Sequence, residues 1–194
     1  GIIRMTMRLK LYTLLCASFL FLFTSCNQDD DPVPPEAGSK TVLVYIVADN
    51  SLASFAKEDV EEMIEGMKLV GSSSCNLLVY QDDRNTPVLF RIAKDKKGNV
   101  EKEIIKEYAE QVSTDVSVMK EVMHRAFYEY PADSYGLVYW SHADGWIPYP
   151  VPSASTRWIG QDKGAGQDNR MNISDLVTVL DDNMPHFDFI MFDA

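Results

Sequence analysis

The sequence contains few cysteines, and their positions leave no pair for an internal disulfide. Its 194 residues include three, of which Cys16 and Cys26 lie near the N-terminus and only Cys75 lies further along. A single cysteine excludes a disulfide-stapled scaffold for the rest of the chain. The sequence also lacks a phosphate-binding loop, a dinucleotide-binding glycine pattern and the Cys/His spacing of a zinc site. These absences argue against nucleotide-dependent enzymes and zinc-stabilised domains.

Basic side chains are also scarce. The sequence has 18 Lys and Arg against 29 Asp and Glu, which gives a formal net charge of −11. Three of the basic residues and none of the acidic ones lie in residues 1–25, so the remainder carries 15 basic and 29 acidic residues, a net charge of −14. So acidic a surface argues against nucleic acid as a partner. It is compatible with basic substrates, although solubility alone is the commoner cause.

The apolar run near the N-terminus is too short to cross a bilayer as a helix. Residues Leu11–Phe23 are apolar apart from Thr13 and Ser18, and the basic segment Met7–Lys10 precedes them. A short apolar core behind basic residues is typical of a secretory signal peptide. We therefore predict that residues 1–25 are a signal peptide and that the protein is exported.

The predicted leader ends at a cysteine. Leu22–Ser25 followed by Cys26 resembles the bacterial lipobox, in which small residues precede a cysteine that is acylated after cleavage. We therefore predict lipidation at Cys26 and anchoring to the membrane. Residues 26–39 are acidic and rich in proline, which predicts a disordered tether and resembles a signal for display on the cell surface. An ordinary secretory signal with an unrelated cysteine is the alternative.

Residues 40–194 alternate strand-like and helix-like patterns. Thr41–Ala48 is a continuous apolar, β-branched run, which predicts a strand buried on both faces. The turn signal Lys94–Asn99 predicts an edge hairpin, and right-handed crossovers would make the other strands parallel. The predicted class is α/β with a mostly parallel central sheet. The further expected elements are strands Asn76–Gln81, Pro87–Ile92, Val100–Ile105, Tyr135–Trp140 and Phe187–Phe192, and helices Ser113–Tyr130 and Asn172–Asn183.

Polar residues follow the strands at the edge where chemistry occurs in open α/β sheets. They are Asp49, Asn50, Asp82, Asp83, His142, Asp144 and Asp193. Carboxylates grouped around one histidine suggest a functional cluster, although Asp and Asn are also common turn residues. Cys75 precedes its strand, and His124 and His186 lie within a helix and at a strand entry. These three residues are therefore expected away from His142.

Four blocks of sequence, in order, resemble the clostripain family of cysteine endopeptidases. They are Val44–Leu52 with the later Asp59, Trp140–Trp146, Ile173–Leu176 and Phe187–Ala194. In that family the last block continues Asp-Ala-Cys, and this cysteine is the nucleophile; here Ala194 is the last residue. The resemblance implies a caspase-like α/β/α sandwich, with residues 40–194 as the N-terminal part of the peptidase domain.

The resemblance also implies roles for individual residues. His142 would be the general base for a cysteine directly after Ala194, and the backbone N–H beside it, at Ala143, would stabilise the oxyanion. The family usually has glycine at the position of Ala143, and an alanine there is expected to lower activity if the position requires a positive φ or a close approach of the substrate. Asp193, with Asp144 and Trp146, would bind the Arg or Lys that precedes the cleaved bond. Without the nucleophile, the 194 residues alone are predicted to be inactive.

Residues 147–171 read as a long irregular stretch with three prolines and three glycines. Long loops inside compact domains are usually functional or disordered. Related enzymes cut themselves in such a loop after a basic residue, which makes Lys163 the first candidate and Arg157 the second; a plain flexible loop is the alternative. The family resemblance also allows a calcium requirement, but the sequence shows no recognisable set of ligands for calcium and predicts no other cofactor.

Two other functions remain open at this point. One is a catalytically inactive, clostripain-like surface lipoprotein that binds peptides. The other, less favoured, is a metal-dependent adhesion module, because Asp49-Asn50-Ser51 follows a strand. Such modules need Asp-x-Ser-x-Ser, and the fifth position here is Ala53.

Overall fold

The structure is a computed structural model that describes five segments of the chain: residues 39–70, 75–95, 97–143, 158–181 and 183–193. The predicted signal peptide, the predicted lipidation site Cys26 and nearly all of the predicted tether lie outside these residues. Among the described residues, no helix is long and apolar enough to span a membrane.

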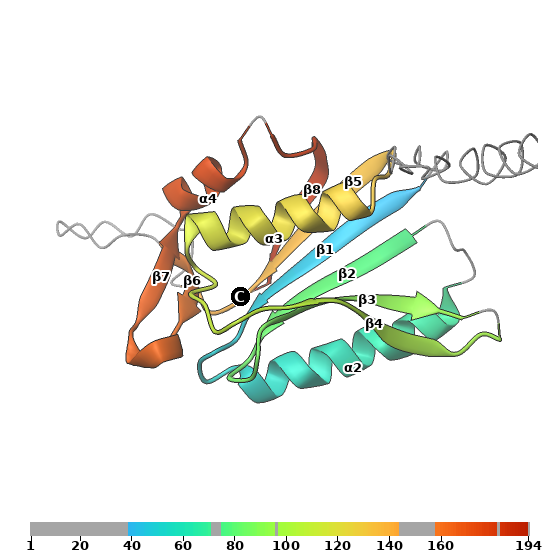
Figure 1. Cartoon of the computed structure of the whole chain (residues 1–194), viewed down its shortest axis with the longest axis horizontal. Helices are drawn as coiled ribbons and strands as arrows, with labels where there is room; N and C mark the ends of the chain where they lie inside the picture. Colours follow the sequence, from blue (N-terminus) through green and yellow to red (C-terminus); the bar gives the residue numbers. More distant parts are fainter. Residues whose placement is uncertain (1–38, 71–74, 96, 144–157, 182, 194) are drawn as a thin grey trace, which may run out of the picture. The chain divides into compact units, whose positions relative to one another are not determined.

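A six-stranded sheet forms the centre of the described structure, in the order β4-β3-β2-β1-β5-β8 (Figure 1). Strands β1, β2, β5 and β8 run parallel, while β3 and β4 form an antiparallel hairpin at one edge. The predicted α/β class with a mostly parallel sheet is therefore confirmed, and the edge hairpin lies where it was expected. The bounds are β1 Lys40–Val47, β2 Cys75–Asp82, β3 Val88–Lys94, β4 Val100–Glu107, β5 Ser134–Trp140 and β8 Phe187–Asp193.

Strand β1 lies between β2 and β5 and is buried on both faces, as its unbroken apolar sequence predicts. Leu43, Tyr45 and Val47 contribute to one core, and Val44 and Ile46 to the other. The first core includes residues of helices α3 (Val116–Glu129) and α4 (Ile173–Val179). The second includes residues of helix α2 (Ala53–Leu69). Helices on both faces give the three layers α/β/α (Figure 1).

Two predicted helices are shorter in the structure. Helix α3 begins after Asp115, whose side chain accepts hydrogen bonds from the backbone N–H groups of Ser117 and Val118. Ser113, the first residue of the predicted helix, is instead buried and hydrogen-bonded to the side chains of Tyr80 and Asp82. Helix α4 ends at Val179, about a turn before the predicted end. Periodicity in the sequence does not show whether tertiary contacts will hold a polar residue, such as Ser113, away from the start of a helix.

The prediction that residues 147–171 are wholly irregular is wrong for the part that the structure describes. Strands β6 (Trp158–Asp162) and β7 (Asn169–Asn172) form an antiparallel pair, joined through a short 3₁₀ turn, η1 (Gly164–Gly166). Two apolar residues of this hairpin, Ile159 and Met171, enter the core. Its other strand residues are mostly polar or glycine, so it lacks the apolar alternation by which strands are predicted.

Candidate active site

The carboxyl ends of β1, β2, β5 and β8 meet at one edge of the sheet, as predicted. The structure separates the polar residues expected there into two groups. One group surrounds His142, which lies two residues after β5. This group is next to helix α2, to which it is joined by a hydrogen bond from Trp140 to Asp59. The other surrounds Asp82, the last residue of β2, beside Ser113 in the segment before α3.

His142 is half-buried and contacts the loop that follows β1. Its Nε2 atom lies 2.8 Å from the Oγ atom of Ser51. When the serine accepts a hydrogen bond from Nε2–H, the lone pair of the ring lies on Nδ1, which can then take up a proton. Sequence reasoning did not single out Ser51 for this role, because the contact joins residues 91 positions apart.

Ser141 holds the backbone beside the histidine. Its hydroxyl donates to the carbonyl oxygen of Val47 at 2.9 Å and accepts from the backbone N–H of Gln161 at 3.1 Å. Its own backbone N–H donates to the carbonyl oxygen of Asp193 at 3.2 Å. The buried Ser141 therefore links the ends of β1, β6 and β8, which restrains the position of His142.

A pocket of about 310 Å³ opens beside His142. Two carboxylates, those of Asp59 and Asp193, line it together with the imidazole. Asp193 enters the site because it pairs in register with Trp140 on the neighbouring strand. Asp59 accepts a hydrogen bond of 2.8 Å from the indole Nε1–H of Trp140. The complete lining is Leu52, Phe55, Asp59, Trp140, Ser141, His142 and Asp193.

The chemistry of this pocket suits a long cationic side chain. Neither Asp59 nor Asp193 takes part in an ion pair within the described residues. Leu52 and Phe55 add apolar surface, and Phe55 is 54% exposed although it is aromatic. Apolar walls with acidic groups can bind the aliphatic stem and the charged head of Arg or Lys.

Several predicted site residues cannot be placed. Asp144, Trp146 and Arg157 lie outside the described residues, as does Ala194. Ala143 is described and follows His142 as a half-buried residue.

Lys163 is exposed and lies in the turn between β6 and β7. Its backbone N–H donates to the carbonyl oxygen of Asp49 at 2.8 Å, and the N–H of Gly164 donates to Asp162 Oδ1 at 2.7 Å. With φ −108° and ψ 14°, Lys163 is not extended. The peptide bond after Lys163 is thus held within a folded turn, from which it would have to be released to bind in an extended conformation.

The second group of polar residues is a cluster of carboxylates. Oxygen atoms of Asp49, Asp82 and Glu110 lie within 4.8 Å of one another. The pKa of Asp82 is raised to about 7, mainly because the side chain is buried and also because other carboxylates lie nearby. A hydrogen bond from Ser113 acts in the opposite direction and lowers it. Burial also raises the pKa of Asp162 and that of Glu110. Sequence reasoning missed Asp162, because strand β6 was not predicted, and Glu110, because it lies beyond the end of β4 rather than directly at it.

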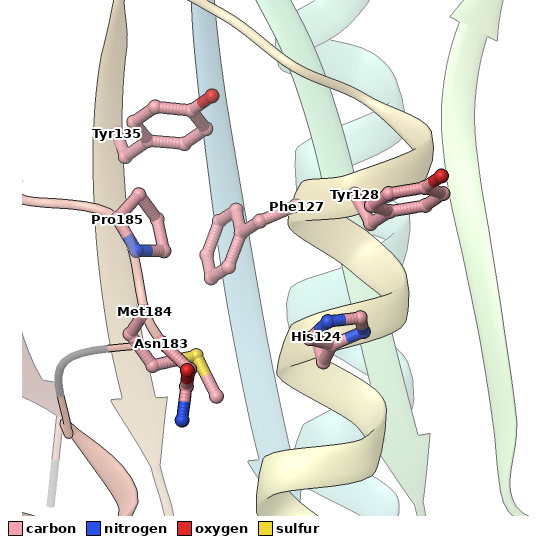
Figure 2. A pocket seen from close by; sticks show the side chains of 7 residues that line it. All are labelled: His124, Phe127, Tyr128, Tyr135, Asn183, Met184 and Pro185. Carbon is pink, nitrogen blue, oxygen red and sulfur yellow. The ribbon is translucent and has the colours of Figure 1, made fainter. Parts of the chain in front are cut away.

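Other candidates lie elsewhere, as expected. Cys75 is the first residue of β2, at the opposite end from the site, and burial raises the pKa of its thiol. His124 lines a separate pocket of about 280 Å³ near the amino ends of β5 and β8. Figure 2 shows that pocket between helix α3, which carries His124, Phe127 and Tyr128, and the segment around Pro185.

Comparison with known proteins supports one family. The model of the clostripain family matches residues 44–194. A solved structure described as a secreted C11 cysteine protease from Bacteroides thetaiotaomicron, in complex with an irreversible peptide inhibitor, is 57% identical with a TM-score of 0.69. The match covers 79% of this chain and 41% of that one, so this chain spans less than half the length of that relative. No significant match was found among curated proteins.

Two further structures are similar. A B. fragilis cysteine protease is 55% identical with a TM-score of 0.55, covering 60% of this chain and 98% of that one. An inactive zymogen C11 protease from Parabacteroides distasonis is 32% identical with a TM-score of 0.63, covering 81% of this chain and 42% of that one.

Proposed function

Because the chain belongs to the clostripain family of cysteine proteases, we propose that it is the histidine-bearing part of an endopeptidase that cleaves after Arg or Lys. The proposal rests on the pocket that His142 and Asp193 line together. Both residues lie at the carboxyl ends of neighbouring parallel strands, β5 and β8. By family resemblance the nucleophile is a cysteine directly after Ala194. The 194 residues without that cysteine are therefore expected to be inactive.

In the proposed mechanism, His142 acts first as a base and then as an acid. Nδ1 takes the proton of the cysteine thiol, and the thiolate attacks the peptide carbonyl carbon. The imidazolium then gives its proton to the leaving amine, and water hydrolyses the thioester to release the acid and regenerate the thiol. Ser51 is a positioning residue, because a hydroxyl that accepts from Nε2–H keeps Nδ1 available.

Backbone and pocket groups complete the proposed site. The N–H of Ala143 would donate to the oxyanion, as the resemblance implies, and alanine retains this donor. We assign the cation of the substrate to Asp193, because Asp59 already accepts a hydrogen bond from Trp140. Asp144 and Trp146 remain proposed substrate contacts from the sequence alone.

We also propose self-processing, with Arg157 as the preferred position. The sequence favoured Lys163, but two backbone hydrogen bonds and a folded conformation oppose cleavage there. A protease cleft binds extended backbone, so the turn at Lys163 would have to open first. In the sequence, Arg157 immediately precedes Trp158, the first residue of strand β6.

Export and membrane anchoring remain part of the proposal. One similar protein is described as secreted, and residues 1–25 of this chain have the pattern of a signal peptide. We propose that Cys26 carries a lipid and that residues 26–39 are a tether. Metabolic labelling with a fatty-acid analogue would test this, since Cys26→Ser should abolish the label and release the protein from the membrane.

The full-length protein, assayed on Arg- and Lys-containing peptides with and without a thiol alkylator, tests the central proposal. Cleavage after Arg or Lys that the alkylator abolishes supports it. Cleavage that survives alkylation contradicts it. Peptide binding without cleavage would favour the inactive, peptide-binding alternative, for which Ala143 in place of the usual glycine is the supporting observation.

A further inference from the structure

The loop after β1 carries Ser51, whose Oγ atom lies 2.8 Å from Nε2 of His142. Ser51 is exposed, so core packing does not fix its position. Because each peptide unit is planar, a side chain on a loop moves when the peptide unit before or after it rotates. The contacts of the two peptide units that flank Ser51 therefore decide how well the serine can orient the histidine.

Both of these peptide units are hydrogen-bonded. After the serine, the backbone N–H of Leu52 donates to Oδ1 of Asn50 at 2.8 Å. Before the serine, the carbonyl oxygen of Asn50 accepts a hydrogen bond of 2.7 Å from the guanidinium of Arg84, which lies 34 positions away in the sequence. The side chain of Asn50 is itself fixed, because its Nδ2 atom donates to the carbonyl oxygen of Gln161 at 2.6 Å. Ser51 is thus held from both sides.

The guanidinium of Arg84 is available for this contact. It takes part in no ion pair among the residues that the structure describes. The carboxylate next to it in the sequence, that of Asp83, accepts hydrogen bonds from the side-chain amides of Gln81 at 2.7 Å and Asn85 at 2.8 Å. A hydrogen bond from a charged donor is stronger than one between neutral groups, so Arg84 is a firm anchor for the carbonyl oxygen of Asn50.

The backbone of Arg84 is in an unfavourable conformation. Its φ is 72°, and no other residue in the described segments except glycine has a positive φ. The left-handed region is costly for a residue with a Cβ atom, and residues held there concentrate at functional sites. Glycine would adopt the same conformation without this cost. An exposed arginine at such a position indicates that its side chain has a role.

We propose that Arg84 is a positioning residue: it fixes the peptide unit before Ser51 and thereby holds the serine hydroxyl against His142. The proposal rests on the proposed peptidase function, in which this serine keeps Nδ1 of the histidine available for the proton of the cysteine. Arg84 acts through Ser51 and transfers no proton itself. Without the guanidinium, the peptide unit can rotate, and the hydroxyl no longer stays within reach of the imidazole.

A double-mutant cycle in the full-length protein tests this route. Arg84→Met should lower kcat about fivefold with KM nearly unchanged. Arg84→Lys retains a cationic donor and should restore most of the loss. In the Ser51→Ala background, Arg84→Met should have no further effect on kcat, because its influence passes through the serine hydroxyl. A residue that served only the stability of the fold would lower activity in both backgrounds.

Two further variants control for folding and for the loss of an arginine as such. Arg84→Gly suits the positive φ, so it removes the guanidinium without backbone strain and should match Arg84→Met in kcat. Arg125→Met is the same change on helix α3, where the guanidinium bonds Glu121 and Glu129. This variant should keep the kcat of the wild type.

Nitrogen NMR of the full-length protein, labelled at histidine, gives a readout that does not require catalysis. At a pH where the ring is neutral, His142 should carry its proton on Nε2 in the wild type and in Arg125→Met. Arg84→Met and Ser51→Ala should show a mixture of the two tautomers. The signal that disappears in His142→Ala identifies the residue.

Two results would overturn the proposal. One is an Arg84→Met protein with the kcat and the histidine tautomer of the wild type, and the other is an equal loss of kcat in the wild-type and Ser51→Ala backgrounds. A protein that cleaves no peptide, but in which Arg84→Met changes the tautomer of His142, would contradict only the proposed peptidase function.

Discussion

The Oγ atom of Ser51 lies 2.8 Å from Nε2 of His142, although the two residues are 91 positions apart. The contact forms because β1 and β5 are parallel neighbours, so the loops that follow them leave the sheet side by side. One side of the imidazole is thereby engaged, which leaves the other nitrogen for proton transfer. This geometry underlies the first prediction.

Ser51→Ala should lower the kcat of the full-length protein about tenfold, with KM nearly unchanged, because the histidine loses the partner that orients it. Ser51→Thr retains the hydroxyl and should restore most of the activity. Steady-state kinetics on one Arg-containing peptide separates the two parameters. Equal activity in the alanine and wild-type proteins would show that Ser51 does not position the base.

His142→Ala should reduce peptide cleavage by about a thousandfold or more, since both proton transfers are lost. His124→Ala is the matched control, because that histidine lines a different pocket and should be dispensable for cleavage. Melting temperatures near that of the wild type would confirm that both variants fold. If His142→Ala remains active, another residue must be the base.

Asp193→Asn should lower kcat/KM for Arg and Lys substrates by about tenfold to a hundredfold, because the substrate cation loses the charged partner of a charge-assisted hydrogen bond. Asp188→Asn, an exposed change on the same strand, should have little effect. Competition between peptides that differ only in the residue before the cleaved bond gives the measurement. An equal loss for cationic and neutral residues would argue that Asp193 serves the structure rather than specificity.

Arg157→Gln should leave the full-length protein uncut, whereas Lys163→Gln should be processed normally. The reason is that the backbone at Lys163 is tied to Asp49 and Asp162. Gel analysis and mass spectrometry of the purified proteins would locate the cut. Processing that stops only with Lys163→Gln would restore the order expected from the sequence.

Two glycine substitutions should change stability in opposite directions. At Gly160 a Cβ atom would collide with the hydroxyl of the buried Tyr139, so Gly160→Ala should lower the free energy of unfolding by about 1–3 kcal/mol. At Gly66, within α2, a Cβ atom would meet nothing within 4 Å, so Gly66→Ala should raise it by up to about 1 kcal/mol. Urea denaturation of each variant against the wild type measures both. A stabilised Gly160→Ala protein would mean that the hairpin packs differently.

Much of the fold was predictable because its main elements carry strong local signals. The apolar run of β1 and the turn before β4 each determine their structure within a few residues. The β6–β7 hairpin was missed because it is held by tertiary contacts, such as the hydrogen bond of 2.6 Å from the side chain of Asn50 to the carbonyl oxygen of Gln161. A bond between residues that far apart leaves no periodic pattern in the sequence.

By itself, the sequence determined the α/β class, the family and the placement of His142 and Asp193 at the ends of strands, because these depend on local patterns and ordered motifs. Only the tertiary structure decided which polar residues meet: Ser51 with His142, Asp59 with Trp140, and Glu110 and Asp162 with Asp49 and Asp82. The physical reason is that strand order and loop paths set distances between side chains, and neither is written in the composition or periodicity of any one segment.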